Sequence, residues 1–216
     1  KVMLENEERY ESNDMIREMM LLAGEGAARF AFKNQIPFPY VSQEAPQIPE
    51  NLPEGYAGEF AKIKCMRKRS VGITPSPHAS LGISFYSQVT SPLRRYGDLI
   101  AHEQLRAFLN GEKLIGKDEM LERISAGDAA SIDARKACRM SEMHWKLVYL
   151  LQNPELKYEA VCIDKKGEDA LCLIPCLDMQ TLLSGYAKNL ELNEKVVLFM
   201  KSVDIPNQGV VFAVEG

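Results

Sequence analysis

The spacing of apolar residues divides the chain into a helical part and a β part. Between residues 13 and 33, apolar or small side chains recur every three or four positions, which predicts a helix capped by Ser12 or Asn13. The stripe expected to face the core consists of Met15, Met19, Leu22, Ala23, Gly26, Ala27 and Phe30. Similar spacing predicts helices over 56–69, from Pro92 to about 109, and over 117–153 with a break near Gly127. Five prolines between residues 36 and 53 predict an extended or looped segment.

After Pro154 the pattern changes to short runs rich in apolar and β-branched residues. Runs at 157–164, 169–175, 194–201 and 209–215, with turn signals at DKKG and PNQG, predict strands. The expected fold class is therefore α+β. Residues 1–154 are mostly helical, and residues 155–216 form a small all-β unit of the barrel type.

Composition and charge narrow the class of protein. The chain has 216 residues, of which 46% are hydrophobic and 26% charged, which is typical of soluble globular proteins. No apolar run reaches the ~18 residues of a membrane span, and the first residues do not resemble a signal peptide. The five cysteines show no C-x-x-C spacing, so we expect no zinc site, no disulfide framework and a reducing, cytoplasmic setting.

A net charge of −4 means that an anionic partner would have to meet a local basic patch. The run KIKCMRKR contains Lys64 and Arg67, which are candidates for contacting nucleic acid. The ordinary alternative is a solvated helix face, and this feature alone favours that alternative.

The stretch TSPLRRYGD, residues 90–98, places two arginines at the expected start of a helix. With Ser91 as N-cap, Arg94 lies in the first turn and Arg95 just behind it, where the helix dipole disfavours cations. Asp98 can pair with Arg94 four residues earlier, but that pairing leaves Arg95 unexplained. Backbone N–H groups beside guanidinium groups suit a phosphate, so an anion site and a structural Arg–Asp pair both fit the motif.

A longer segment around this motif, PHASLGISFYSQVTSPLRRYGDLIAH, resembles the end of the catalytic domain of the ribonuclease II / ribonuclease R family, the RNB family. The residues that match the family pattern are Pro77, His78, Leu81, Gly82, Tyr86, Thr90, Ser91, Pro92, Arg94, Arg95, Tyr96, Asp98 and His102. Residues 12–43 and 130–152 resemble helical and extended segments of the same domain, and residues 155–216 fall where the family has an OB-fold RNA-binding barrel. The resemblance implies that residues 1–154 are the C-terminal part of an RNB catalytic domain.

The family resemblance also implies an activity and a set of site residues. It implies an Mg²⁺-dependent exoribonuclease that degrades single-stranded RNA processively from the 3′ end to nucleoside 5′-monophosphates. Arg94 would be the catalytic arginine on the scissile phosphate, Arg95 would add positive potential, and Glu18 would contact the 3′-terminal nucleotides and help to select ribose. Tyr86 and His78 are further substrate-binding candidates, for which the alternative is that they shape the site or the core.

Two parts of such an enzyme are weak or missing in the sequence. The aspartates are scattered, so no metal ligand is assigned in this chain, and Mg²⁺ would be held by aspartates in an N-terminal portion of the same nuclease. In the barrel, Tyr158 is the candidate for stacking on RNA bases, with filling of the barrel core as the favoured alternative for it and the other three aromatics. The expected partners are therefore single-stranded RNA and the N-terminal portion, and the alternative is a degenerate relative that binds RNA without cutting it. The intact Arg94 and Glu18 favour the nuclease.

Overall fold

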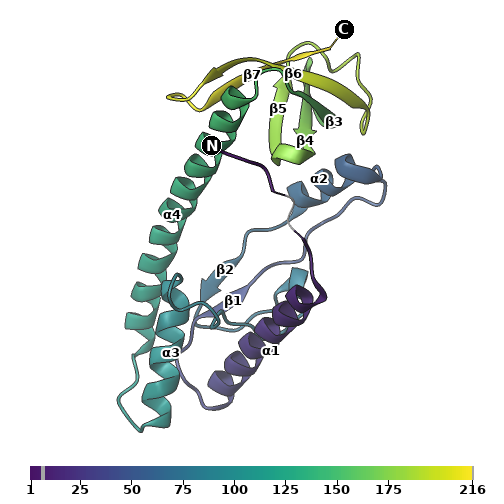
Figure 1. Cartoon of the computed structure of the whole chain (residues 1–216). Helices are drawn as coiled ribbons and strands as arrows, with labels where there is room; N and C mark the ends of the chain where they lie inside the picture. The colour runs from purple at the N-terminus through teal and green to yellow at the C-terminus, as the bar shows by residue number, and fades with distance from the viewer. Residues whose placement is uncertain (6–7, 216) are drawn as a thin grey trace. The chain divides into compact units, whose positions relative to one another are not determined.

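The computed structural model describes residues 1–5 and 8–215, which combine helices with two antiparallel sheets (Figure 1). These residues form two compact units, and each unit is built from separate segments of the chain. We call residues 8–46 and 67–135 the motif unit, and residues 1–5, 47–66 and 136–215 the barrel unit. The expected boundary near residue 154 lies just before the first strand of the barrel, β3 (Lys157–Lys166). The barrel unit also contains segments that precede this boundary, residues 1–5, 47–66 and 136–153. Within the described residues, every helix is too short or too polar to cross a membrane.

The motif unit contains three helices and a small sheet. Its elements are α1 (Glu11–Lys33), β1 (Tyr40–Ser42), β2 (Ser70–Gly72), the 3₁₀ helix η1 (Ala79–Leu81), α3 (Tyr96–Leu109) and the first part of α4 (Lys117–Gln152). Strands β1 and β2 pair antiparallel, with Val41 opposite Val71. One core cluster forms around α1, β1 and α3, and its buried members are Ala28, Ala31, Ile36, Phe38, Tyr40 and Ala101.

Helix α1 lies where the apolar periodicity predicts a helix, but the prediction of which of its residues face the core is wrong. The buried positions are Gly24, Ala28 and Ala31, whereas Met19 is 58% exposed and Leu22 is 70% exposed. The helix packs through its small residues because it approaches the segment after η1 very closely: the Ser87 N–H donates to the Gly24 carbonyl at 3.3 Å. The expected cap is also wrong, because the N-cap is Tyr10 and no side chain bonds the helix start.

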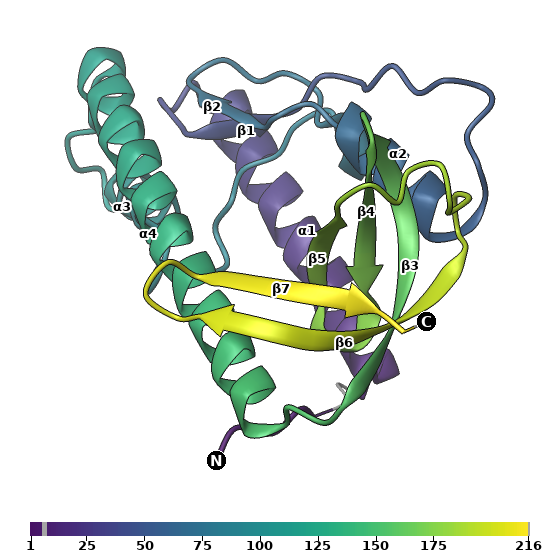
Figure 2. The ribbon, with the colours of Figure 1, turned by 90° about the horizontal axis from the view of Figure 1, so that it is seen from above.

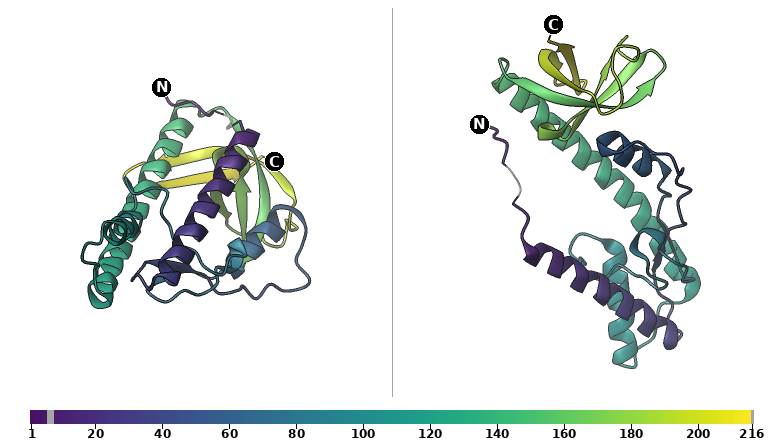
Figure 3. Two further views of the ribbon diagram at one scale, coloured as in Figure 1. Left: turned by 90° about the horizontal axis from the view of Figure 1, so that it is seen from below. Right: turned by 90° about the vertical axis from the view of Figure 1, so that its right-hand side faces the viewer.

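Helix α4 is continuous over 36 residues, so the break expected near Gly127 is wrong (Figure 3). A Cβ at Gly127 would lie 3.0 Å from the ring of Tyr96. The glycine therefore makes room for an aromatic side chain from α3, and it does not interrupt the helix.

The barrel unit contains a five-stranded antiparallel sheet that nearly closes into a barrel (Figure 2). Its strands are β3 (Lys157–Lys166), β4 (Asp169–Ile174), β5 (Met179–Leu183), β6 (Lys195–Asp204) and β7 (Gly209–Val214), and a 3₁₀ helix, η2 (Pro175–Leu177), lies between β4 and β5. The strand order is β5-β4-β3-β6-β7, and the two outer strands contact each other. This arrangement is the OB-type barrel expected from the sequence. Four strands are confirmed at the predicted positions, and β5 was not predicted.

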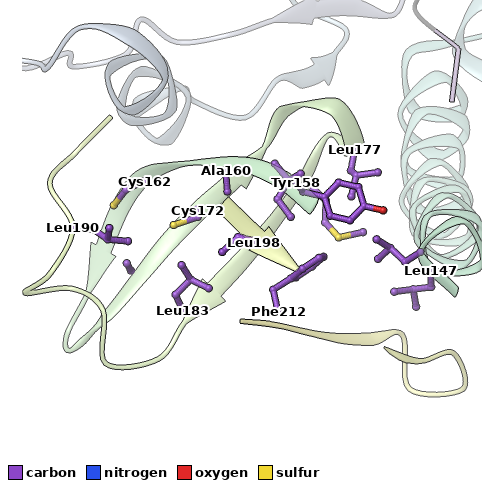
Figure 4. Packing of buried hydrophobic residues seen from close by; sticks show 14 residues of the cluster. Leu147, Tyr158, Ala160, Cys162, Cys172, Leu177, Leu183, Leu190, Leu198 and Phe212 are labelled. Atoms are coloured by element: carbon purple, nitrogen blue, oxygen red, sulfur yellow. The ribbon is translucent and has the colours of Figure 1, made fainter. Parts of the chain in front are cut away.

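Alternating residues of β3 fill the barrel (Figure 4). Tyr158, Ala160 and Cys162 point inward, and the Tyr158 ring meets Phe212 edge to face at 6.2 Å between centroids. Burial raises the pKa of Tyr158 to about 12. Val161, which points the other way, is also buried, at 2% exposure.

Helix α2 (Gly55–Cys65) covers the outside of β3 within the barrel unit. Its start is capped from far along the chain: Asn193 Oδ1 accepts the Ala57 N–H at 2.9 Å, and Asn193 Nδ2 donates to the Glu54 carbonyl at 2.7 Å. The helix ends four residues before the predicted limit of 69, because the backbone turns extended at Met66 and then enters β2.

Candidate active site

The two arginines of TSPLRRYGD lie in a turn that precedes α3, and not in the helix itself. The N–H groups of Arg94 and Arg95 both donate to the Ser91 carbonyl, at 3.2 and 3.0 Å. Arg95 is then extended (φ −126°, ψ 113°), and the helix begins at Tyr96. The expected helix start at Ser91 and Pro92 is therefore wrong by about one turn.

Asp98 pairs with Arg95, and not with Arg94 as the four-residue spacing suggests. Arg95 Nη2 lies 2.7 Å from Asp98 Oδ2 and 3.2 Å from Thr90 Oγ1. The Asp98 side chain is 1% exposed and that of Arg95 is 25% exposed, so this is a largely buried ion pair. Asp98 also stands in the first turn of α3, where a negative charge is favourable to the helix dipole.

Arg94 is exposed, and within the described residues it makes no ion pair or side-chain hydrogen bond. The two neighbouring arginines are thus different in kind. The charge of Arg95 is compensated inside the protein, whereas the guanidinium of Arg94 is available to bind an anion from outside.

His78 and Tyr86 pack together beside this pair. Their rings meet edge to face at 5.7 Å between centroids, and His78 is only 8% exposed. Burial lowers the pKa of His78, because it disfavours the charged imidazolium form. Burial raises the pKa of Tyr86, and the nearby positive charge of Arg95 acts in the opposite direction. These positions suit residues that shape the site, which is the alternative given for them above.

His102 fixes the approach to the turn. Its Nε2 lies 2.6 Å from the Val89 carbonyl oxygen, to which the ring N–H donates. Together, His102 and Asp98 bond the segment 89–91 from one face of α3.

Glu18 lies on α1, six residues before Gly24, where α1 contacts Tyr86 and Ser87. Its carboxylate is 66% exposed and bonds to the neighbouring Arg17 at 3.1 Å. The structure therefore leaves Glu18 accessible on the helix that packs against the motif, but no contact joins it to Arg94 in the described residues.

The candidate RNA-binding residues outside the motif differ in their exposure and in their partners. Tyr158 lies in the barrel core with 4% exposure, so it cannot stack on a base, as the alternative reading of the sequence held. Lys64 forms an ion pair with Asp164 at 2.9 Å, whereas Arg67 is exposed. Phe199 is 40% exposed on β6, which corrects the expectation that all four barrel aromatics fill the core. The alternation along β6, with Leu198 fully buried, could have identified it.

The described residues contain no group of three or more His, Cys, Asp or Glu side chains placed to hold a metal ion.

Known proteins resemble this chain in sequence and in fold. Residues 56–111 match the family described as RNB domain. An uncharacterized ribonuclease of Synechocystis sp. is 40% identical over 164 residues, which cover 73% of this chain and 25% of that protein. The chloroplastic/mitochondrial ribonuclease II of Arabidopsis thaliana is 37% identical over 168 residues, which cover 74% of this chain and 19% of that protein. This chain thus spans a quarter or less of the length of these relatives.

Solved structures share the fold at low sequence identity. RNase R of Mycoplasma genitalium in complex with ribose-methylated single-stranded RNA superposes with a TM-score of 0.78 and 15% identity, over 97% of this chain and 42% of that one. Yeast Ssd1, described as a pseudonuclease, has a TM-score of 0.58 and 15% identity, over 93% of this chain and 29% of that one. The fold alone therefore does not distinguish nucleases from relatives described as inactive. The RNB-domain match and the two ribonuclease relatives confirm the resemblance inferred from the sequence: this chain is similar to a fragment of RNB-family proteins.

Proposed function

We propose that this chain is the C-terminal part of a hydrolytic exoribonuclease that degrades single-stranded RNA processively from the 3′ end to nucleoside 5′-monophosphates. The observation that carries the proposal is the difference between the two arginines. Arg95 forms an ion pair with the buried carboxylate of Asp98, whereas the neighbouring Arg94 is exposed. A planar guanidinium with no internal partner suits the non-bridging oxygens of a phosphodiester, on which negative charge builds up during hydrolysis.

An N-terminal portion of the same nuclease completes the site in this proposal. Mg²⁺ would be held there, by clustered aspartates outside this chain. Glu18 would select ribose at the 3′ end. The five cysteines are all free thiols, which supports a reducing compartment such as the cytoplasm.

The test compares variants of the complete nuclease on uniformly labelled single-stranded RNA with Mg²⁺ present. Arg94→Ala should lower the rate of mononucleotide release by about 10²–10³-fold and change the RNA dissociation constant little. Arg106→Ala is the matched control, because Arg106 is another exposed arginine of the motif unit, in the last turn of α3. Unchanged turnover in Arg94→Ala would overturn the proposal.

The same assay separates the nuclease from an RNA-binding relative. If the complete wild-type protein binds RNA with a strong salt dependence but releases no mononucleotide, the non-catalytic alternative is correct. For Glu18→Ala, we expect a smaller preference for RNA over DNA, with Glu11→Ala on the same helix as the control. An unaltered preference would remove Glu18 from the site.

A further inference from the structure

The turn that carries Arg94 is not held by the packing of its own side chains. Leu93 is 101% exposed, and Arg94 is exposed as well. The two exposed side chains gain little from burial, so the conformation of the turn depends on its hydrogen bonds. These are the backbone bonds of Arg94 and Arg95 to the Ser91 carbonyl and the side-chain bonds at the two ends of the turn.

Both ends of this turn are bound by the same carboxylate oxygen. Asp98 Oδ2 accepts the backbone N–H of Ser91 at 2.7 Å and Nη2 of Arg95 at 2.7 Å. The carboxylate is 1% exposed, and it stands on the first turn of α3, which is anchored by the fully buried Ile100 and Ala101. Asp98 therefore links a rigid helix to the residues on either side of Arg94.

We propose that Asp98 is the positioning residue for Arg94, which it acts on by clamping Ser91 and Arg95. This inference rests on the proposed function of Arg94. In this proposal Arg95 holds the turn by donating a hydrogen bond to Asp98, and it does not contact RNA directly. His102 extends the clamp by one helical turn through its bond to Val89.

Two substitutions of Asp98 can distinguish the effect of its hydrogen bonds from the effect of its negative charge. Oδ1 of Asp98 is buried and has no hydrogen-bond partner within the described residues. An asparagine can therefore place its carbonyl oxygen at the Oδ2 position and keep both hydrogen bonds, although it loses the negative charge. Alanine removes the bonds and the charge together. A clamp that works through geometry requires Asp98→Asn to be milder than Asp98→Ala.

A double-mutant cycle in the complete nuclease tests the proposal. Single-turnover rates of RNA cleavage are measured for Asp98→Ala, Asp98→Asn, Arg94→Ala and the double variant Arg94→Ala with Asp98→Ala. Asp133→Ala, at an exposed position of α4, is the control. Asp98→Ala should slow cleavage about 10²-fold, because a misplacement of about 1 Å has an effect of that order, while the RNA dissociation constant changes less than about threefold. In the Arg94→Ala background the same change should slow cleavage less than about twofold, because no Arg94 remains to be misplaced.

Hydrogen exchange on this 216-residue chain gives a readout that does not need activity. Asp98→Ala and Asp98→Asn should speed exchange of the backbone amides between Ser91 and Arg95 (Pro92 has none), with Asp98→Asn the smaller effect, whereas Arg94→Ala should leave it unchanged. Equal rate losses with and without Arg94, or unchanged exchange at 91–95 in both Asp98 variants, would overturn the inference. If Asp98→Ala does not fold, Asp98→Ser takes its place in both arms of the test, because its hydroxyl is too short to accept both hydrogen bonds. Full turnover in Arg94→Ala would instead refute the proposed function of Arg94, and the exchange measurement would still decide whether Asp98 holds the turn.

Discussion

Two glycines of α1, only two positions apart, should respond in opposite ways to the same substitution. At Gly24 an added Cβ would lie 2.5 Å from Cε2 of Tyr86 and 2.6 Å from the carbonyl oxygen of Ser87. At Gly26 nothing lies within 4 Å of the added atom. Gly26→Ala should therefore stabilise the protein by about 0.5–1 kcal/mol, which is the gain in helix propensity.

Gly24→Ala makes the same gain in propensity but must push the helix away from a backbone carbonyl. Overpacking of this kind typically costs about 1–3 kcal/mol. The shift would also weaken the Ser87-to-Gly24 hydrogen bond, which contributes about 1 kcal/mol. The net result is a loss of about 1–3.5 kcal/mol.

Thermal unfolding of the chain measures both effects. For a protein of this size 1 kcal/mol corresponds to roughly 2–4 °C in Tm. Gly24→Ala should thus lower Tm by about 2–14 °C, and Gly26→Ala should raise it by about 1–4 °C. If both variants raise Tm equally, α1 does not pack in van der Waals contact with the segment that carries Tyr86, and the account of its small-residue face is refuted.

Three other measurements address the barrel unit. Asn193→Ala should cost about 1 kcal/mol and speed hydrogen exchange at the start of α2, because that helix loses its cap; unchanged exchange would contradict the capping role. Cys138 should react with iodoacetamide at pH 8 in the folded protein, whereas Cys172, whose pKa burial raises to about 12, should react only after unfolding. The hydrogen bond from Lys64 lowers the pKa of Asp164, so it adds stability above pH ~4 that is lost as the pH falls through the lowered pKa. The stability difference between wild type and Lys64→Met should therefore shrink on acidification, and a constant difference would refute the pairing.

Periodicity predicted correctly those helices and strands whose hydrophobic pattern is visible within their own residues. The helices α1, α3 and α4 and four barrel strands overlap the predicted ranges because their patterns persist over several turns or alternations. Strand β5 was missed because it has five residues and follows a 3₁₀ turn, so its alternation has little length over which to show.

The buried face of α1 could not be predicted from hydrophobicity, because the size of the side chains determines which face is buried. Close approach to residues 86–87 requires small side chains, and the larger methionines and leucine were left exposed. Nor could the pairing inside the candidate site be predicted from spacing. Arg94 and Asp98 would face each other only if both lay in one helix, and the extended backbone at Arg95 breaks that relation. The set of candidate site residues came from the family resemblance, and their roles stay a prediction.

The cap that Asn193 places on α2 has a consequence for the order in which the protein can fold as it is synthesised. The residues that it joins are 136 positions apart, so α2 leaves the ribosome long before its cap and before the strand that it covers. An isolated helix of 11 residues is marginal in water, which means that α2 cannot persist alone during that interval. We therefore expect α2 and β3 to become stable together, once Asn193 has been synthesised, and the barrel unit to be complete only when β6 and β7 are available.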